Sequence, residues 1–281
     1  MLNSDQAEFW EEVAPTWVEL EDLFEDVGAE PGRRAMARLE LAGGERVLDL
    51  GCGTGTTSVE LGSMVGAGGH VLGLDIASGM LDQARARVEK AGAGNVEFRL
   101  ADVEVERLEP GCYDAAFSRF GVMFFTDPVA AFANVRRALR PGATLSFVCW
   151  QTVFENEWML VPGMAAASVT GSLPPMPGPD EPGPFAFADT GKVERILGQA
   201  GFVDVDIVPH NDEVVGGEDY VPRIAELSTR VGAASEAIRQ AEELRPQIVA
   251  AVTEALKEKV RDKELHLSRG ILLVRASVPT D

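Results

Sequence analysis

Residues 46–57, Arg-Val-Leu-Asp-Leu-Gly-Cys-Gly-Thr-Gly-Thr-Thr, decide the fold of this chain. The apolar run over residues 46–50 predicts a short buried parallel strand, and residues 56–65 predict a helix directly after it. Glycines at every second position of the turn between them permit positive φ angles and let a ligand approach the backbone. The first N–H groups of the helix have no partners within it, so they face that ligand. The stretch therefore predicts a nucleotide-binding turn.

The spacing of these glycines distinguishes between kinds of nucleotide. A dinucleotide-binding turn has the pattern G-x-G-x-x-G, whereas this chain has G-x-G-x-G, with Thr56 where the third glycine would stand. No Lys-Ser or Lys-Thr pair follows, which disfavours a phosphate-binding P-loop. Asp49, just before the turn, would repel a pyrophosphate but suits a cationic amino-acid group. The turn therefore favours a ligand with a positively charged end.

On these residues the stretch resembles motif I of the class I S-adenosylmethionine-dependent methyltransferases, in particular the small-molecule enzymes of the ubiquinone and menaquinone type. The resemblance extends over about residues 44–210 and the final strand. Residues 139–148, LRPGATLSFV, look like another signature of that family. The resemblance implies S-adenosyl-L-methionine as the cofactor, with Asp49, Gly51 and Gly53 at its binding site.

The composition limits the partners that the chain can take. Of 281 residues, 45 are acidic and 25 are basic, so the net charge is -20 and the surface should repel nucleic acid and anionic membranes. The acidity can equally serve solubility alone. We see neither a basic signal sequence nor an apolar run long enough to span a bilayer, and we expect a cytoplasmic protein. Three cysteines without close pairing predict reduced thiols rather than a metal site.

The amino-terminal segment, residues 1–43, predicts a helical cap. Apolar side chains recur at helical spacing over residues 5–26, and Pro31 predicts the start of a second helix that ends near Leu41. In the methyltransferases that the chain resembles, such a segment folds over the cofactor, and an aromatic residue in it often contacts the methionine part. We expect Trp17 to make that contact; core packing is the alternative.

The second and third predicted strands end in acidic residues. Asp75 follows the glycine turn by about 20 residues, the distance at which a carboxylate meets ribose hydroxyls in related folds. Such a carboxylate can accept charge-assisted hydrogen bonds from both hydroxyls. The family resemblance implies that Ile76 packs against adenine, that Asp102 accepts the N6 amino group and that the backbone of Val103 faces the ring. A capping or turn role is the alternative for both carboxylates.

The turn after the fourth predicted strand combines polar and aromatic residues. In the fold that the chain resembles, this turn lies beside the methionine end of the cofactor, so we expect Ser118 to contact the amino group. Arg119 is a candidate for binding a substrate carboxylate, with a surface ion pair as the alternative. Small-molecule pockets are mostly apolar with a few polar groups, and we expect Phe120, Met123 and Phe124 to line one.

The predicted elements alternate between strands and helices. Helices are expected at residues 56–65, 78–90, 128–139, 189–200 and over 218–261; strands are expected at 46–50, 70–75, 96–100, 113–118, 143–150, 202–208 and 268–276. This order predicts an α/β fold, a Rossmann-like three-layer sandwich around a seven-stranded, mostly parallel sheet. The resemblance implies that the last strand is antiparallel.

Composition divides the chain into a core and insertions. We expect the cofactor-binding core at residues 44–150, continued at 189–210 and completed by the last strand and tail at 268–281. A Pro-rich insertion at 151–188 and a helical insertion at 211–267 interrupt it. Ligands bind at the carboxyl edge of the strands in open α/β sheets, so we expect both insertions to form lids over a small-molecule pocket there.

The resemblance implies transfer of a methyl group from S-adenosyl-L-methionine to an O, N or C nucleophile of a small hydrophobic or aromatic metabolite, by in-line displacement. A general base would assist a phenol or an alcohol. His210, after the sixth strand, and His266, before the last, are the candidates at the active edge; a solvated loop position is the alternative for each.

Two other functions stay open at this point. One is a protein on the same fold that binds S-adenosylmethionine without transferring its methyl group, because a fold does not fix a function. The other is a nicotinamide-dependent oxidoreductase, which Thr56 in place of the third glycine disfavours. We expect a small-molecule methyl acceptor, no metal, and no nucleic-acid or membrane partner. The sequence leaves the oligomeric state open.

Overall fold

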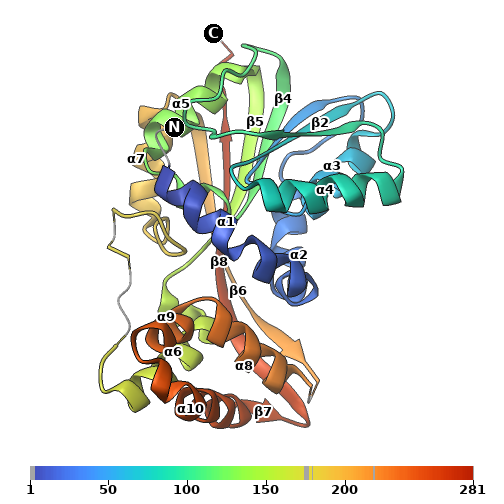
Figure 1. Ribbon diagram of the computed structural model, residues 1–281. Coiled ribbons are helices and arrows are strands. Elements are labelled where there is room, and N and C mark those ends of the chain that lie inside the picture. The colour runs from blue at the N-terminus through green and yellow to red at the C-terminus, as the bar shows by residue number, and fades with distance from the viewer. Residues whose placement is uncertain (1–3, 174–176, 179, 218, 281) are drawn as a thin grey trace.

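The structure is a computed structural model that describes residues 4–173, 177–178, 180–217 and 219–280. Of the two predicted insertions, residues 174–176, 179 and 218 lie outside the described residues. Figure 1 shows an upper part built on a sheet and a lower part built from helices, with two long strands running through both.

One sheet of eight strands organises the described chain. The strand order is β3-β2-β1-β4-β5-β8-β6, and β7 pairs with the end of β8. Strands β1 to β5 run parallel, whereas β8 is antiparallel to both β5 and β6. The predicted fold class is therefore confirmed, with β7 as a short addition. The strands are β1 (Arg46–Leu50), β2 (His70–Asp75), β3 (Val96–Leu100), β4 (Tyr113–Arg119), β5 (Leu139–Trp150), β6 (Val203–Gly216), β7 (Val260–Arg261) and β8 (Glu264–Ser277).

Helices flank the sheet and build the lower part. In Figure 1, α5 and α7 lie to the left of the strands and α3 and α4 to the right, while α6, α8, α9 and α10 form the lower part. Helices α1 and α2 pass in front of the junction between the two parts. The helices are α1 (Ser4–Glu19), α2 (Glu21–Ala37), α3 (Thr56–Val65), α4 (Ser78–Ala91), α5 (Pro128–Ala138), α6 (Glu157–Thr170), α7 (Thr190–Gln199), α8 (Tyr220–Arg230), α9 (Ala233–Gln240) and α10 (Arg245–Lys257).

The glycine turn connects β1 to α3 as predicted, and its geometry requires glycine. Gly51, Gly53 and Gly55 all have positive φ angles, of 66°, 54° and 82°. A Cβ atom at Gly55 would lie 2.8 Å from the Cβ atom of Ala84 and 2.9 Å from the ring of Phe98. The third glycine therefore lets the start of α3 pack closely against α4 and β3.

The lower part has a hydrophobic core of its own. Side chains from α8, α10 and the first half of β8, including Ile224, Ile248, Val252, Leu256 and Leu267, are completely buried there. Helix α6 packs against α9 and α10. This core is separate from the one around the parallel strands, so the cavity described below has walls from two independently packed parts.

The second helix begins at Glu21, so the prediction that it begins at Pro31 is wrong. Pro31 lies inside α2, where it has no N–H to donate to the carbonyl of Val27, four residues earlier. That carbonyl accepts a hydrogen bond of 2.5 Å from Nη1 of Arg269 on β8 instead. Tertiary structure thus satisfies the group that proline leaves free, and the helix continues.

The two strands that join the parts are longer than predicted. The sixth strand was expected to end at Val208, before Pro209, but β6 continues to Gly216 and pairs with β8 along its length. Proline is tolerated on an edge strand, and β6 is the edge of the sheet. The last strand begins at Glu264 rather than Ser268.

Two helical regions also differ from the expectation. Helix α6 lies in the first half of the Pro-rich insertion, where no helix was predicted. Its sequence is apolar on nearly all sides, so it lacks the amphipathic periodicity that marks a surface helix. The predicted helical region over residues 218–261 consists, in its described part, of α8, α9 and α10 followed by β7.

Candidate active site

The described residues enclose a cavity of about 550 Å³ at the junction of the two parts. The carboxyl ends of β1, β2 and β4 contribute Gly51, Asp75 and Arg119. Helix α1 and the turn between α8 and α9 supply further walls, the latter through Gly232 and its neighbours. The cavity therefore lies at the edge of the sheet where open α/β folds bind their ligands.

Asp75 and the glycine turn form one wall of this cavity. The Asp75 carboxylate accepts a hydrogen bond of 2.7 Å from the N–H of Gly53 and one of 3.0 Å from the N–H of Ala77. Each carboxylate oxygen keeps a second lone pair. A Cβ atom at Gly53 would meet no atom within 4 Å, so this face of the turn borders open space. Burial raises the pKa of Asp75.

Asp102 lies at the neighbouring strand end with half of its carboxylate unused. Its side chain is buried, and Oδ1 accepts a hydrogen bond of 2.9 Å from the N–H of Glu104. Oδ2 is buried and has no hydrogen-bond partner among the described residues. Asp102, Ile76 and Val103, the residues predicted to contact adenine, all line the cavity. An unpaired acceptor between two apolar side chains fits the amino edge of an adenine ring.

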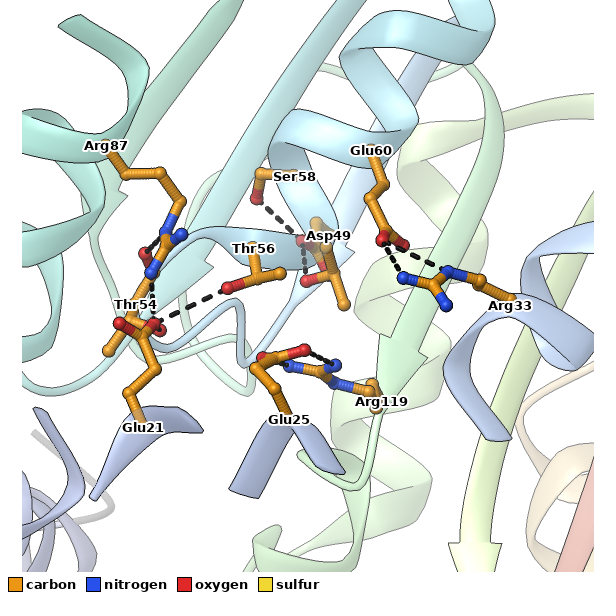
Figure 2. Close-up of polar contacts among 11 residues, drawn as sticks. Glu21, Glu25, Arg33, Asp49, Thr54, Thr56, Ser58, Glu60, Arg87 and Arg119 are labelled. Carbon is orange, nitrogen blue, oxygen red and sulfur yellow. Dashed lines mark hydrogen bonds and ion pairs between the residues drawn. The ribbon is translucent and has the colours of Figure 1, made fainter. Parts of the chain in front are cut away.

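Asp49 lies beneath the cavity rather than in its wall. Its side chain is fully buried, and Oδ2 accepts hydrogen bonds from the hydroxyls of Thr57, at 2.7 Å, and Ser58, at 2.6 Å. These bonds hold the first turn of α3, as Figure 2 shows for Ser58. Burial raises the pKa of Asp49 to about 6. The carboxylate therefore fixes the start of α3 relative to β1 from behind the cavity wall.

Ser118 does not line the cavity, which argues against its predicted contact with the ligand amino group. Its hydroxyl donates a hydrogen bond of 2.7 Å to the carbonyl of Leu50 and accepts one of 3.3 Å from the N–H of Gly121. The side chain is fully buried between the ends of β1 and β4. Ser118 therefore fixes the two loops relative to each other.

Arg119 lines the cavity but is already paired. Its guanidinium donates hydrogen bonds of 2.8 and 2.5 Å to the two carboxylate oxygens of Glu25 on α2 (Figure 2). The aliphatic part of the Arg119 side chain passes close to Gly32, where a Cβ atom would lie 2.8 Å from Cδ of Arg119. Burial raises the pKa of Glu25, but the guanidinium outweighs this effect and the pKa is lowered. The arginine thus holds α2 over the site.

Helix α2 carries further contacts that the sequence reading missed. Glu21 binds the guanidinium of Arg87 on α4 and the hydroxyl of Thr54 in the glycine turn. Further along α2, Arg33 reaches Glu60 on α3 at 3.0 Å. Glu21 and Glu25 are four residues apart, and this spacing places them on one helix face. Figure 2 shows both directed at the glycine turn, and that spacing was the signal available in the sequence.

Aromatic side chains form a large share of the remaining cavity wall. All four tryptophans of the chain, Trp10, Trp17, Trp150 and Trp158, line it. Trp17 stacks on Phe24 with ring centroids 3.7 Å apart, so the predicted contact residue also packs within the cap. The predicted substrate residues Phe120, Met123 and Phe124 line the cavity as well, together with Phe9, Phe125 and Phe185.

Phe120 occupies a strained backbone conformation in this wall. Its φ angle is 61°, a left-handed conformation that a bulky side chain rarely adopts. Its ring stacks on that of Trp150 with centroids 3.8 Å apart and planes 9° apart. Such strain persists where the surrounding structure enforces it, often at ligand sites. The flat stack is therefore a defined surface of the cavity.

Neither candidate base lines the cavity. His210 lies on β6 and His266 on β8, two strands that pair antiparallel. Each is close to a carboxylate: His210 lies 3.4 Å from Asp212, and Nδ1 of His266 lies 2.9 Å from Glu213. Both histidines thus lie within paired strands, whereas the sequence predicted His210 after the sixth strand and His266 before the last. This placement argues against the predicted role of either histidine as general base.

The described ranges, 4–173, 177–178, 180–217 and 219–280, contain neither a candidate metal centre nor a candidate membrane-spanning helix. They hold no group of three or more His, Cys, Asp or Glu side chains arranged to bind a metal ion. They also contain no helix with the length and apolar character needed to cross a membrane.

Comparison with known proteins agrees with this geometry. Residues 47–142, from β1 to the start of β5, match the family model described as a methyltransferase domain. This range contains the glycine turn, Asp75 and Asp102. Together with the sheet order, the match supports a methyltransferase domain of the class I S-adenosylmethionine-dependent type over these residues.

Two curated relatives and one solved structure illustrate the likeness. Aklanonic acid methyltransferase from Streptomyces sp. strain C5 is 34% identical over 116 residues, 41% of this chain and 53% of that protein. Nocamycin O-methyltransferase from Saccharothrix syringae is 30% identical over 180 residues, 62% of this chain and 64% of that protein. The chain thus matches less than two thirds of either relative.

The solved structure is phosphoethanolamine N-methyltransferase 2 from Haemonchus contortus, in complex with phosphomonomethylethanolamine and S-adenosylhomocysteine. It superposes with a TM-score of 0.55 at 20% identity, over 89% of this chain and 52% of that one. At this identity the likeness shows the shared fold.

Proposed function

We propose that this chain binds S-adenosyl-L-methionine and transfers its methyl group to a small, hydrophobic or aromatic acceptor. The observation that carries the proposal is one cavity with two chemically different ends. Carboxylates and a glycine turn lie at the sheet end, and aromatic rings lie at the other. The relatives named above methylate small molecules according to their names, which supports the same class of acceptor.

The sheet end fits the adenosyl part of the cofactor. Asp75 holds the ribose hydroxyls with its remaining lone pairs, and the unpaired Oδ2 of Asp102 accepts the adenine amino group. Ile76 and Val103 pack on the base. Asp49 adds a negative potential beneath the amino-acid end, where the cofactor is cationic. The backbone of Gly51 and Gly53 comes close to the ligand without a Cβ atom.

The aromatic end holds the acceptor and excludes water. The bound cofactor supplies a methyl group that the sulfonium charge already activates, so the chain contributes mainly position. Well-oriented reactants reach effective molarities of about 10⁵ to 10⁸ M. The stacked pair Phe120 and Trp150 gives the acceptor a fixed flat surface. Trp10 on α1 packs edge-on against Phe124, with ring centroids 4.9 Å apart, and covers this end of the cavity. The nature of the attacking atom, O, N or C, is set by the acceptor.

Thermal unfolding with single ligands tests the cofactor. A ligand at 100 times its dissociation constant stabilises a protein by about 2.7 kcal/mol. We expect the midpoint to rise with S-adenosylmethionine and with S-adenosylhomocysteine and to stay unchanged with NADH. A rise with NADH alone would favour an oxidoreductase.

Product analysis then tests transfer. An acceptor screen with S-adenosylmethionine labelled on the methyl group should yield labelled product and S-adenosylhomocysteine in equal amounts. Binding of the cofactor without any S-adenosylhomocysteine, across aromatic and aliphatic small molecules, would favour a protein that binds the cofactor without methylating. Labelling of protein or RNA in preference to small molecules would contradict the acceptor class.

A further inference from the structure

Trp158, at the start of α6, is the least satisfied polar side chain at the aromatic end of the cavity. Its ring lines the cavity, yet its Nε1 atom is buried and has no hydrogen-bond partner among the described residues. Buried polar groups are nearly always paired, and leaving a donor unpaired costs free energy. An indole N–H donates and never accepts, so the group that completes it must be an acceptor.

The neighbours of Trp158 cannot provide that acceptor. The ring packs at 5.2 Å and 58° against Trp150, and Met159 and Pro162 line the cavity next to it on α6. Two other unpaired buried atoms belong to residues of the cavity wall, Oε1 of Gln6 and Oδ2 of Asp102. Asp102 lies at the adenosyl end. An amide such as Gln6 both donates and accepts, whereas the unpaired Trp158 N–H requires an acceptor on the ligand.

The flat stack beside Trp158 specifies the rest of the ligand. Phe120 and Trp150 lie with their planes 9° apart, and Trp150 contacts the Trp158 ring. Aromatic rings gain most by offset stacking or by edge-to-face packing on such a surface. A ligand that contacts both features is therefore a planar ring system with a hydrogen-bond acceptor at its edge.

We propose that Trp158 is a specificity-determining residue that selects aromatic methyl acceptors carrying a ring carbonyl, whose oxygen accepts the indole N–H. This inference rests on the proposed function, because it assigns the aromatic end of the cavity to the acceptor. Nε1 is closed off by its neighbours in the free chain, so the acceptor binds with a rotation of the Trp158 side chain about its χ angles. The indole N–H, which is unpaired in the free chain, then donates a hydrogen bond to the carbonyl oxygen.

Matched ligands can isolate this hydrogen bond. The 2-, 3- and 4-hydroxy isomers of 9-fluorenone each have a partner hydroxyfluorene that differs only by the carbonyl oxygen. Dissociation constants are measured by calorimetry on the full chain saturated with S-adenosylhomocysteine, so no turnover is required. We expect at least one ketone to bind about five- to tenfold more tightly than its hydroxyfluorene, the gain typical of one neutral hydrogen bond.

Substitutions in the same wall locate the effect. Trp158→Phe keeps a ring but removes the N–H, and we expect the ketone preference to fall to about one while the affinity for S-adenosylhomocysteine is unchanged. Phe154→Leu, at an exposed position four residues before Trp158, is the control, and it should keep the preference. Trp158→His restores a ring N–H and should regain part of it. If Trp158→Phe fails to fold, Trp158→Leu replaces it, with circular dichroism as the check on folding.

The outcomes separate the inference from the proposed function. Failure of the wild-type chain to bind S-adenosylhomocysteine contradicts the proposed function itself. Binding of S-adenosylhomocysteine without a preference for any ketone contradicts the role of Trp158 alone, as does a preference that persists in Trp158→Phe or disappears equally in Phe154→Leu.

Discussion

The two ends of the cavity are built in different ways. At the sheet end, each polar group comes from a turn that directly follows a strand, and backbone N–H groups hold the carboxylate of Asp75 in place. At the aromatic end, the wall comes from α1, the turn after β4, α6 and the turn between α8 and α9. The sheet end is therefore formed by residues close together in the sequence. The aromatic end forms only when segments far apart in the sequence pack together.

This difference separates recognition by hydrogen bonds from recognition by shape. Each carboxylate at the sheet end forms hydrogen bonds with particular atoms of the cofactor. Each substitution there should therefore remove the binding energy of one group of the cofactor. The aromatic end offers an apolar contact surface that many related ligands can cover. We therefore expect strict cofactor selection and graded acceptor selection, and the following predictions test that contrast.

The largest effect is expected at Asp75. Asp75→Ala removes two hydrogen bonds to the ribose, and bonds to a charged group contribute about 1.5–3 kcal/mol each. We expect the affinity for S-adenosylhomocysteine to fall by about 100-fold or more, as measured by calorimetry. Asp82→Ala, on the exposed face of α4, is the control and should bind normally. A loss of less than about fivefold would place the ribose elsewhere.

Asp49 should affect stability as well as binding. Its pKa of about 6 in the folded chain lies above that of an unfolded aspartate, so the folded state binds the proton more tightly. The free energy of unfolding therefore falls as the pH rises from about 4 to about 6 and stays lower above. Two pKa units correspond to about 3 kcal/mol. Asp49→Asn should remove this pH-dependent loss of stability, and it should also weaken cofactor binding.

Urea unfolding from pH 4 to pH 8 checks this prediction. The stability of Asp49→Asn relative to wild type should increase across the range by up to about 3 kcal/mol. For the control Asp82→Asn, the free energy of unfolding should change with pH as it does for wild type. A constant difference between Asp49→Asn and wild type would mean that the buried carboxyl does not titrate in this range.

Asp102 should control which base the site accepts. We expect wild type to prefer S-adenosylhomocysteine over S-inosylhomocysteine, in which an oxygen replaces the N6 amino group, by about tenfold. Asp102→Asn can donate to that oxygen and should reduce or reverse the preference. Competition binding measures both ligands. An unchanged preference would show that the unpaired Oδ2 faces some other group.

The smallest effect is expected at the two histidines. A general base contributes about 10²- to 10⁴-fold to a rate, so loss of a true base would be conspicuous. Because neither histidine lines the cavity, we expect His210→Gln and His266→Gln to keep kcat/KM within about twofold, with an unchanged pH profile, for any acceptor found in the screen. A loss of 100-fold with an altered pH profile would restore the predicted role.

The elements of the core could be predicted closely because their signals are local. The β1–α3 turn, the strand ends at Asp75 and Asp102, and the helix capped by Asp127 lie where the residue pattern predicts them. Predictions failed where tertiary contacts overrode local preference. Pro31 looked like a helix start because its partner, the Arg269 side chain, is far away in the sequence. The sixth strand was predicted to end at Val208, one residue before Pro209, because its edge position, which tolerates proline, is a property of the assembled sheet.

The sequence by itself determined the α/β fold, the glycine turn and the carboxylates of the sheet end, since these depend on residues within a few positions of each other. Only the tertiary structure decided that Asp49 and Ser118 lie behind the cavity wall, that Arg119 pairs with Glu25, and that both histidines lie outside. It also decided that four tryptophans from three segments line one cavity. The physical reason is that burial and pairing are properties of contacts between distant segments, which no local pattern records.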